Sequence, residues 1–347
     1  MNITTIGFDL AKNVFQVHGV NEHSKAVLRK TLKRAEVMSF FAKLQPCLIG
    51  MEACGSAHFW ARKLGELGHM VKLMAPQFVK PYVKTNKNDA RDAEAICEAV
   101  ARPNMRFVPL KTVEQQGLLA LHRARQGFVA ARTGQANQIR GLLAEFGIVI
   151  PKGIRNLERR MPEILEDAEN GLRATSRELF NRLFGHFRVL DRQVSELELQ
   201  IKAWHLESTE SLRLEAIPGI GPITASALVA SIGDARTFKN GRQLAAWLGL
   251  VPRQDSSGGK ERLLRISKRG DTYLRTLLIH GARSVLLRLK CHAEQAEGWL
   301  ARLARRRNPN IAAVALANKN ARIVWALLAH ERDYQAGYVS ARSEAAA

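Results

Sequence analysis

The sequence predicts an α/β domain at the N-terminus followed by a mostly helical remainder. Short apolar strand patterns alternate with helical patterns up to about residue 100, and strand patterns stop from about residue 111 onward. The chain has 347 residues, of which 46% are hydrophobic, so it is long enough and apolar enough for more than one core. We expect an α/β domain over residues 1–110, a helical region over 111–210, a C-terminal domain over 211–333 and a disordered tail over 334–347.

The N-terminal elements follow one another in a characteristic order. Three short strands come first, and turn-forming residues near Asn13 and Asn21 separate them. Gly68 ends the second of three helices, and Pro76 closes the last strand. The expected strands cover residues 3–10, 14–20, 26–32, 47–51 and 69–74, and the expected helices cover residues 36–44, 58–67 and 89–101. Three strands followed by helix, strand, helix, strand and helix are the order of an RNase H-like domain.

The helical region contains a heptad seam. Its apolar residues recur at alternating spacings of four and three: Leu183, Phe187, Leu190, Val194, Leu197, Ile201 and Trp204. Apolar residues between 118 and 146 suggest a partner helix earlier in the chain. An intramolecular helical hairpin and a dimerising coiled coil both fit this pattern, and three heptads do not distinguish them.

The charge of the chain points to a polyanionic partner. The 53 Lys and Arg outnumber the 32 Asp and Glu, which gives a formal net charge of +21. Residues 253–333 alone carry 17 Lys and Arg against 7 Asp and Glu. Nucleic acid neutralises such charge by releasing counterions, so we expect nucleic-acid binding, most of it through this C-terminal block. A generally basic, soluble surface is the alternative interpretation.

The sequence gives no sign of export or membrane insertion. The N-terminus lacks a basic segment followed by an apolar one, and no apolar run approaches the ~20 residues of a membrane span. The four cysteines, Cys47, Cys54, Cys97 and Cys291, are scattered and are expected to be reduced core residues. We therefore expect a cytoplasmic protein associated with the nucleoid.

Four acids mark a candidate metal site in the α/β domain. Asp9 lies at the middle or end of the first strand and Glu52 at the end of the fourth. Asp89 and Asp92 are three residues apart on the last helix, so they share one face. Grouped carboxylates suit Mg²⁺ or Mn²⁺, and two such ions can clamp the oxygens of a phosphodiester. One such acid alone is more often a surface residue, but four in this order favour a shared site.

Two basic or glycine-rich segments are candidate DNA contacts. Residues 217–225 resemble a helix-hairpin-helix motif, in which Gly219 and Gly221 would expose backbone N–H groups to phosphate at a helix start. Lys268, Arg269 and Arg275 form a cationic cluster at the start of a later helix. A plain turn and a solvated basic face are the respective alternatives.

Ser257 belongs to a Ser-Ser-Gly-Gly loop over residues 256–259. Such a loop is ordinarily a flexible connection. A nucleophilic serine needs a proton acceptor and charge stabilisation, and neither is evident nearby in the sequence. The residues alone therefore argue only weakly for a catalytic role.

Taken in order, these segments resemble one protein family, the insertion-sequence transposases of the "IS one-ten" family. The resemblance extends from Gly7 to about Leu328 and rests on short motifs that are specific only in combination. These are Gly-Phe-Asp-Leu-Ala-Lys at 7–12, Met-Glu-Ala-Cys-Gly at 51–55, Asp-Ala-Arg-Asp-Ala at 89–93, Gly-Leu-Val-Pro at 249–252 and Ser-Gly at 257–258.

The resemblance implies an activity that the residues alone do not show. It implies a RuvC-like Asp-Glu-Asp-Asp domain formed by Asp9, Glu52, Asp89 and Asp92, and a C-terminal transposase domain whose nucleophile is Ser257. Such proteins excise and insert a mobile element in double-stranded DNA through a covalent phosphoserine link. The resemblance further implies a structured guide RNA encoded by the element, and a homo-oligomer, a dimer or tetramer, in which metal site and serine meet between protomers.

Two other functions remain open. A RuvC-like junction endonuclease would cut DNA with metal-activated water and no covalent intermediate, and Ser257 would be only a loop residue. A non-enzymatic DNA- or RNA-binding factor with a decayed metal site is the other possibility, and the complete acid set argues against it.

Overall fold

The computed structural model describes residues 2–84, 89–291 and 298–336, with every side chain in these ranges except those at positions 89, 290 and 291. The chain divides into two compact units, Met1–Thr112 and Val113–Ala347. The first boundary lies close to the expected one, and the helical region and the C-terminal domain lie together in the second unit. The part of the expected tail from residue 337 onward lies outside the described residues.

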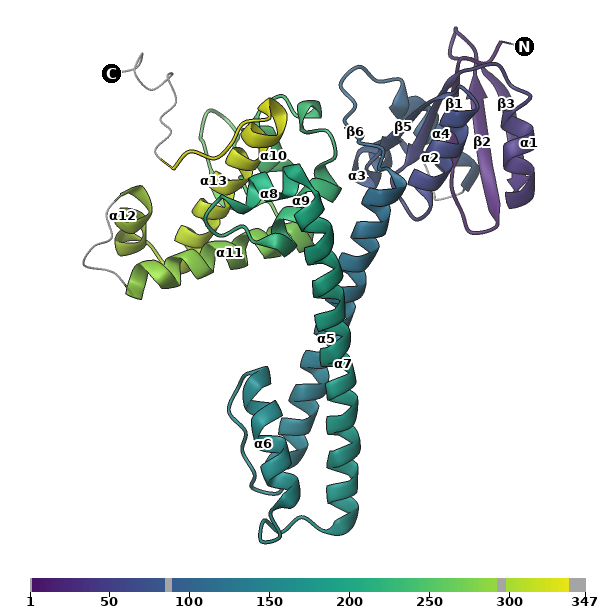
Figure 1. Ribbon diagram of the computed structural model, residues 1–347. Coiled ribbons are helices and arrows are strands. Elements are labelled where there is room, and N and C mark those ends of the chain that lie inside the picture. The colour runs from purple at the N-terminus through teal and green to yellow at the C-terminus, as the bar shows by residue number, and fades with distance from the viewer. Residues whose placement is uncertain (1, 85–88, 292–297, 337–347) are drawn as a thin grey trace. The chain divides into compact units, whose positions relative to one another are not determined.

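The first unit is built on a mixed six-stranded sheet with the order β3-β2-β1-β4-β5-β6 (Figure 1). The strands β1, β2 and β3 form an antiparallel meander, β4 is parallel to β1, β5 is parallel to β4, and β6 is antiparallel to β5. Their bounds are Thr5–Asp9 (β1), Val14–Val20 (β2), Ala26–Lys33 (β3), Leu48–Glu52 (β4), Met70–Met74 (β5) and Phe107–Val108 (β6). The five expected strands are all present, in an arrangement compatible with an RNase H-like domain.

The two faces of this sheet carry different helices. On one face, Phe8, Phe15 and the other inward residues pack in a core with α1 and α2. On the other face, α4 lies across β1, β2 and β4. The helical bounds in this unit are Arg34–Glu36 (η1), Val37–Phe41 (α1), Ala57–Glu66 (α2), Pro76–Val79 (α3), Lys80–Tyr82 (η2) and Asp89–Val100 (α4).

Two glycines allow α4 to lie directly on the sheet. A Cβ at Gly7 would lie 2.0 Å from the carbonyl oxygen of Ala93, and one at Gly50 would lie 2.7 Å from the Cβ of Val100. Any larger residue would push the helix away, since interiors are close-packed. The glycines of β1 and β4 therefore set the position of the helix that carries Asp92.

In the second unit, two long helices form an intramolecular antiparallel pair: α5 (Val113–Ala144) and α7 (Ala174–Glu207), with α6 (Ile154–Glu166) between them in sequence (Figure 1). Arg125 bonds Glu198, whereas Arg132, farther along α5, bonds Asp191, earlier on α7. The predicted seam faces α5, with four of its residues buried, Phe187, Leu190, Val194 and Ile201. Of the two alternatives for the heptads, the structure therefore has the helical hairpin.

The remaining elements form a helical core around α13. The bounds are Thr209–Glu215 (α8), Pro222–Ile232 (α9), Ala235–Thr237 (η3), Gly241–Trp247 (α10), Pro252–Gln254 (β7), Leu263–Ile266 (β8), Thr272–Cys291 (α11), Trp299–Arg306 (α12) and Pro309–His330 (α13). The β7–β8 hairpin was not expected from the sequence. By length and composition α13 could span a membrane, but many of its side chains, such as Leu316 and Val324, pack in this core.

Candidate functional site

Asp9 and Glu52 lie at the ends of two neighbouring parallel strands. Gly7 of β1 pairs with Gly50 of β4, so each acid lies two residues beyond this pair on its own strand. Side chains alternate along a strand, so Asp9 shares the face of Gly7 and Glu52 that of Gly50, the face covered by α4. Both side chains are partly buried. The strand order thus brings together two acids that are 43 positions apart in sequence.

The thiol of Cys54 lies close enough to sense both acids. Its pKa is raised by partial desolvation and by the negative charges of Glu52 and Asp9. The residue is exposed, so the expectation that it belongs to the core is wrong for Cys54, whereas Cys47 and Cys97 are buried. Glu52 and Asp9 therefore create a region of negative potential that an approaching cation would meet.

The first turn of α4 lies at the same end of β1. The Sγ of Cys97 lies 3.7 Å from the carbonyl oxygen of Thr5, and Ala93, one turn earlier, contacts Gly7. The helix therefore runs back along β1 toward Asp9. Asp92, which is partly buried, precedes Ala93 on this path. The side chain of Asp89 lies outside the described residues.

The described side chains fit a metal site in part. Among them, which excludes Asp89, no three His, Cys, Asp or Glu residues gather closely enough to hold a metal ion. Asp9 and Glu52 nevertheless form a pair of hard oxygen donors at a sheet edge, which is the chemistry that Mg²⁺ and Mn²⁺ prefer. Convergence of all four acids remains a prediction.

Ser257 stands at the tip of the β7–β8 hairpin. Lys260 donates a backbone hydrogen bond to the carbonyl oxygen of Ser257 at 3.0 Å, and the two central residues, Gly258 and Gly259, have φ of 55° and 76°. Two consecutive positive φ angles are required by the tight type I′ turn, which explains both glycines. Ser257 is exposed, and within the described part of the chain its hydroxyl has no hydrogen-bond partner.

Ser256 differs from Ser257 in how its hydroxyl is used. The Oγ of Ser256 accepts hydrogen bonds from the backbone N–H of Arg262 at 3.1 Å and from Nε2 of Gln254 at 3.0 Å. These contacts brace the hairpin from inside. The two neighbouring serines therefore have different roles in the loop, a difference that the sequence did not reveal.

Arg275 has a structural role in place of the phosphate contact that we expected. Its side chain is only 7% exposed, and its guanidinium donates to the carbonyl oxygens of Leu248 and Gly270, each at 3.1 Å. A guanidinium used in this way has little surface left for DNA. The expectation for Arg275 is corrected accordingly. Lys268 and Arg269 are exposed and have no ion pair among the described residues, so they remain candidate DNA contacts.

The expected helix-hairpin-helix glycines are placed differently from each other. A Cβ on Gly219 would lie 2.8 Å from the carbonyl oxygen of Gly281 on α11, so this turn is packed against a helix. Gly221 is exposed, and nothing lies within 4 Å of where its Cβ would be. It caps α9, and Pro222 occupies the first turn. Of the two, Gly221 is the one whose surroundings leave room for a phosphate.

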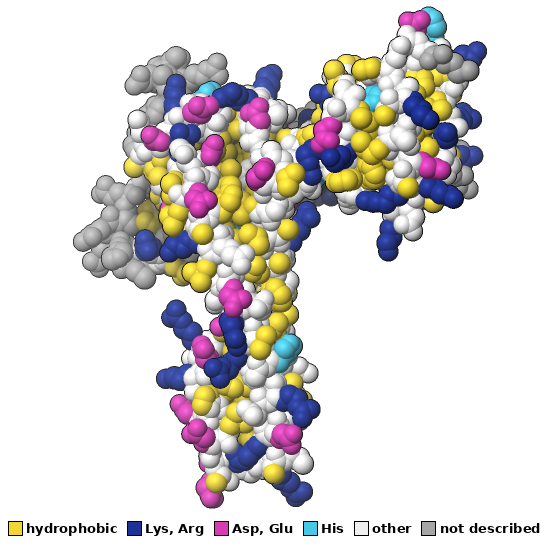
Figure 2. Space-filling model, turned by 45° about the vertical axis from the view of Figure 1, so that its right-hand side comes forward, with side chains coloured by type: hydrophobic (Ala, Val, Ile, Leu, Met, Phe, Trp, Pro, Cys, Tyr) yellow, Lys and Arg dark blue, Asp and Glu magenta, His cyan; other side chains and the backbone are white. Residues whose placement is uncertain are grey.

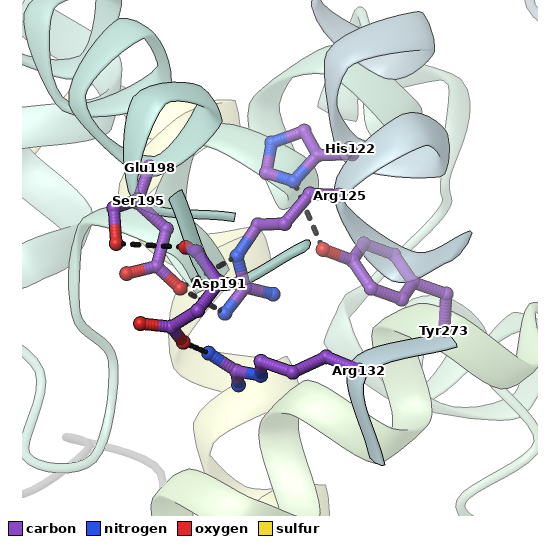
Figure 3. A network of polar contacts seen from close by, with 7 residues as sticks. All are labelled: His122, Arg125, Arg132, Asp191, Ser195, Glu198 and Tyr273. Carbon is purple, nitrogen blue, oxygen red and sulfur yellow. Dashed lines mark hydrogen bonds and ion pairs between the residues drawn. The ribbon is translucent and has the colours of Figure 1, made fainter. Parts of the chain in front are cut away.

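Sequence reasoning missed a polar network in the second unit (Figure 3). His122 of α5 is 1% exposed and contacts Tyr273 of α11, and Arg125 and Arg132 bond the carboxylates of α7. A histidine on a long amphipathic helix gives no sequence signal, because its partners lie about 100 and 150 residues away. The network joins the hairpin of α5 and α7 to the helix that follows Lys268 and Arg269.

The chain is similar to known transposases over almost its whole length. It is 55% identical to a probable family 20 transposase of Pseudomonas aeruginosa over 341 residues, 97% of this chain and all of that protein. It is 45% identical to the transposase for insertion sequence element IS1111A of Coxiella burnetii, over 97% of this chain and 92% of that protein. Residues 211–297 match the transposase IS116/IS110/IS902 family, and residues 6–148 match the transposase domain DEDD_Tnp_IS110.

The chain belongs to the IS110 family of transposases. The resemblance that the motifs suggested is thereby confirmed, and so is the expectation of an enzyme that acts on DNA. In this transposase, the DEDD match covers the sheet with Asp9 and Glu52 and continues into α5. The second match includes both the β7–β8 hairpin and the start of α11.

Proposed function

We propose that this transposase excises and inserts a mobile DNA element, with Asp9, Glu52, Asp89 and Asp92 as metal ligands and Ser257 as nucleophile. The observation that carries the proposal is the placement of Asp9 and Glu52 at the ends of adjacent parallel strands, with the first turn of α4 beside them. Mg²⁺ or Mn²⁺ bound there would stabilise the charge that develops on the phosphate.

In the proposed chemical step, Ser257 is the attacking group. Its Oγ attacks the phosphorus and gives up its proton, a new Oγ–P bond forms, and the bond between phosphorus and the leaving sugar oxygen breaks. The leaving oxygen takes up a proton and becomes a hydroxyl group. The exposed hairpin tip supports this role, since a DNA backbone can reach the hydroxyl and the two glycines add no side chains to obstruct it.

The charge that develops on the phosphate during attack by Ser257 has to be stabilised by other groups. No described side chain lies within hydrogen-bond distance to act as its base. Arg253, Lys260 and Arg262 are exposed cations on the same hairpin, and they can attract and orient a phosphate. The acid set supplies the remaining stabilisation in this proposal, so serine chemistry and acid set should depend on each other.

The partners in this proposal follow from the family and from the charge. Double-stranded DNA, both element ends and target, is the substrate, and a structured RNA encoded by the element guides it. A homo-oligomer, a dimer or tetramer, brings serine and acids onto the same DNA. The net charge of +21 supports binding of more than one nucleic-acid segment. We place this reaction in the cytoplasm, at the nucleoid.

The deciding experiment traps the covalent intermediate. Full-length protein is incubated with radiolabelled element-end DNA, the guide RNA and Mg²⁺, and adducts that survive denaturation are separated by gel electrophoresis. Ser257→Ala should bind DNA like the parent and form no adduct. Ser256→Ala is the matched control and should keep adduct formation, with some loss because its hydroxyl braces the hairpin.

Two outcomes would change the assignment. If the adduct persists in Ser257→Ala and disappears in Ser256→Ala, the nucleophile is Ser256. If DNA is cut in a metal-dependent way and no variant or parent forms an adduct, the protein is a junction endonuclease that uses water. The endonuclease remains a second candidate function because Ser257 has no base beside it in the described structure.

A further inference from the structure

A row of polar side chains continues from Asp9 toward the outer edge of the sheet. In the antiparallel meander, Asp9 pairs with Gln16 of β2, and Gln16 pairs with Thr31 of β3. Paired residues share a face, so Thr31, Gln16 and Asp9 lie side by side on the α4 face, about 5 Å apart from strand to strand. Thr31 donates a hydrogen bond to Oε1 of Gln16 at 2.9 Å, which leaves the Gln16 amide nitrogen to donate elsewhere.

A cleft of about 370 Å³ lies over this row, between the sheet and the first turns of α4. Its lining includes Gln16, the strand partner of Asp9. The cleft is lined by Gln16, Val17, His18, Arg29, Lys30, Thr31, Ala90, Arg91 and Glu94. Most of the side chains are polar, and two are arginines.

His18 forms part of the cleft wall without a described hydrogen-bond partner. It is only 5% exposed, pairs with Arg29 on β3, and makes no hydrogen bond to any residue that the structure describes. Its pKa is lowered mainly by burial, with Glu94 acting against this shift and Arg29 adding to it. A neutral imidazole here can donate one hydrogen bond and accept another.

We propose that this cleft binds the phosphodiester backbone of the DNA strand whose next phosphates reach Asp9 and Glu52. The inference rests on the proposed function of those acids. Arg29 and Arg91 supply positive charge, and His18 and Gln16 supply hydrogen-bond donors, which together suit phosphate oxygens. Glu94 carries the opposing charge, so the cleft holds the strand through a few contacts and leaves tight binding to other regions.

The charge of the first unit fits this assignment. Residues 1–112 contain 17 Lys and Arg against 9 Asp and Glu. Four of these nine acids are the candidate metal ligands, whose charge a bound cation would offset. Figure 2 shows Lys and Arg side chains on the visible face of this unit as well as on the second unit. DNA contact is therefore expected from the unit with the acids, in addition to the basic C-terminal block.

Lys43 provides a matched control for Arg29. Both residues are exposed cations of the first unit, but Lys43 is not among the residues that line the cleft. Removing the charge of Lys43 changes the net charge by the same amount as removing that of Arg29. A difference between the two variants therefore reports on the cleft.

The test measures single-strand binding by full-length protein in EDTA, with a fluorescent oligothymidine and a series of salt concentrations. Arg29→Ala should lower the slope of log affinity against log salt by about 0.7, the value for one lost single-strand phosphate contact. Lys43→Ala should keep the slope of the parent. Equal slopes for parent and Arg29→Ala, with thermal melting showing both folded, would overturn the proposal.

A crosslink identifies the strand that occupies the cleft. Benzoylphenylalanine placed at exposed Thr31 should, on irradiation, crosslink to element-end DNA within a few nucleotides of the cleavage site. A crosslink confined to the guide RNA, or to DNA far from that site, would refute the assignment.

The Asp9→Asn variant separates the two proposals. In one outcome, Asp9→Asn loses cleavage but keeps the salt slope, and Arg29→Ala also keeps the salt slope. This outcome supports the acid site and refutes the cleft. Cleavage that survives in Asp9→Asn refutes the acid site, while a lowered slope in Arg29→Ala still supports the cleft as a DNA contact.

Discussion

The phenolic oxygen of Tyr273 lies 3.0 Å from Nδ1 of His122, on the buried side of α5. The other ring nitrogen, Nε2, lies 3.1 Å from Oγ of Ser226, which itself donates to the carbonyl oxygen of Pro222 at 2.7 Å. Since the Ser226 proton is used at Pro222, Nε2 must donate to Ser226, and Nδ1 accepts from Tyr273. A neutral His122 thus joins α5, α9 and α11 through Ser226 and Tyr273, and Figure 3 shows its contact with Tyr273.

Acid should therefore weaken the second unit through His122. Burial, and secondarily Arg125, lowers the pKa of His122 from 6.5 to about 4. Below pH 6.5 the unfolded chain binds a proton at this histidine that the folded chain does not. The contribution of neutral His122 to the free energy of unfolding is therefore fully present above pH 6.5 and is lost as the pH falls toward 4. The full loss is on the order of 3 kcal/mol. Urea unfolding of the full chain at pH 7 and pH 5 should already show a large part of this loss.

The control for this prediction is His122→Gln, which should be less stable at pH 7 but less sensitive to acid than the parent. His18 in the other unit shifts in the same direction and stays in both proteins, so the difference between them isolates His122. An identical fall in stability in parent and variant would show that His122 is not the group responsible.

Removing one carboxylate should stop DNA cleavage and leave the fold in place. Asp9→Asn and Glu52→Gln each remove ligand charge while keeping side-chain volume, so cleavage in Mg²⁺ should disappear, with melting temperature and DNA affinity near those of the parent. Gel assays of strand cleavage and fluorescence binding measure the two properties.

Glu66→Gln is the comparison for the carboxylate variants, since Glu66 is an exposed acid of the same unit that pairs with Lys63 at the end of α2. It should cleave DNA normally. Full cleavage by Asp9→Asn or Glu52→Gln would exclude that acid from the metal site.

Replacing Lys268 or Arg269 should weaken DNA binding, whereas replacing Arg275 should weaken the fold. Replacing either exposed cation with Ala should weaken binding to every duplex sequence and lower the salt slope by about 0.9, because one phosphate contact is lost. Arg275→Ala should instead lower the free energy of unfolding by about 1–3 kcal/mol, because two buried carbonyl groups lose their donor. Salt titrations and urea unfolding of the three variants distinguish the effects.

If Lys268→Ala and Arg269→Ala together leave affinity and slope unchanged, the two residues are only part of a solvated basic face. If Arg275→Ala is as stable as the parent but has a lower salt slope, the structural assignment of Arg275 is wrong.

A methyl group at Gly7 should displace α4. In Gly7→Ala the added Cβ would lie 2.0 Å from the Ala93 carbonyl, so the first unit should lose several kcal/mol of stability, with cleavage falling as the acids separate. Gly65→Ala is the control, because Gly65 lies in the exposed part of α2 with nothing within 4 Å of the new atom. It should gain about 0.5–1 kcal/mol from helix propensity. Calorimetry that found both variants equally stable would contradict the close contact.

The sequence by itself determined the secondary structure of the first unit and the identity of the family. All five expected strands exist, within a few residues of their expected ends, because alternation of apolar residues and turn residues act locally along the chain. The acids could be found for the same reason, since each lies beside a local motif. The short β6 and the β7–β8 hairpin escaped notice because brief, exposed strands carry little apolar periodicity.

Only the tertiary structure decided how individual side chains are used. Lys268, Arg269 and Arg275 are alike as sequence, yet two are exposed and the third is buried against backbone carbonyls of another segment. Ser256 and Ser257 are adjacent, yet only Ser256 is tied to a backbone N–H across the hairpin. The heptad residues of α7 pack against α5 of the same chain. His122 contacts Tyr273, which lies 151 positions later in the sequence. Burial and hydrogen bonding depend on neighbours that folding brings from far along the chain, and no local pattern encodes them.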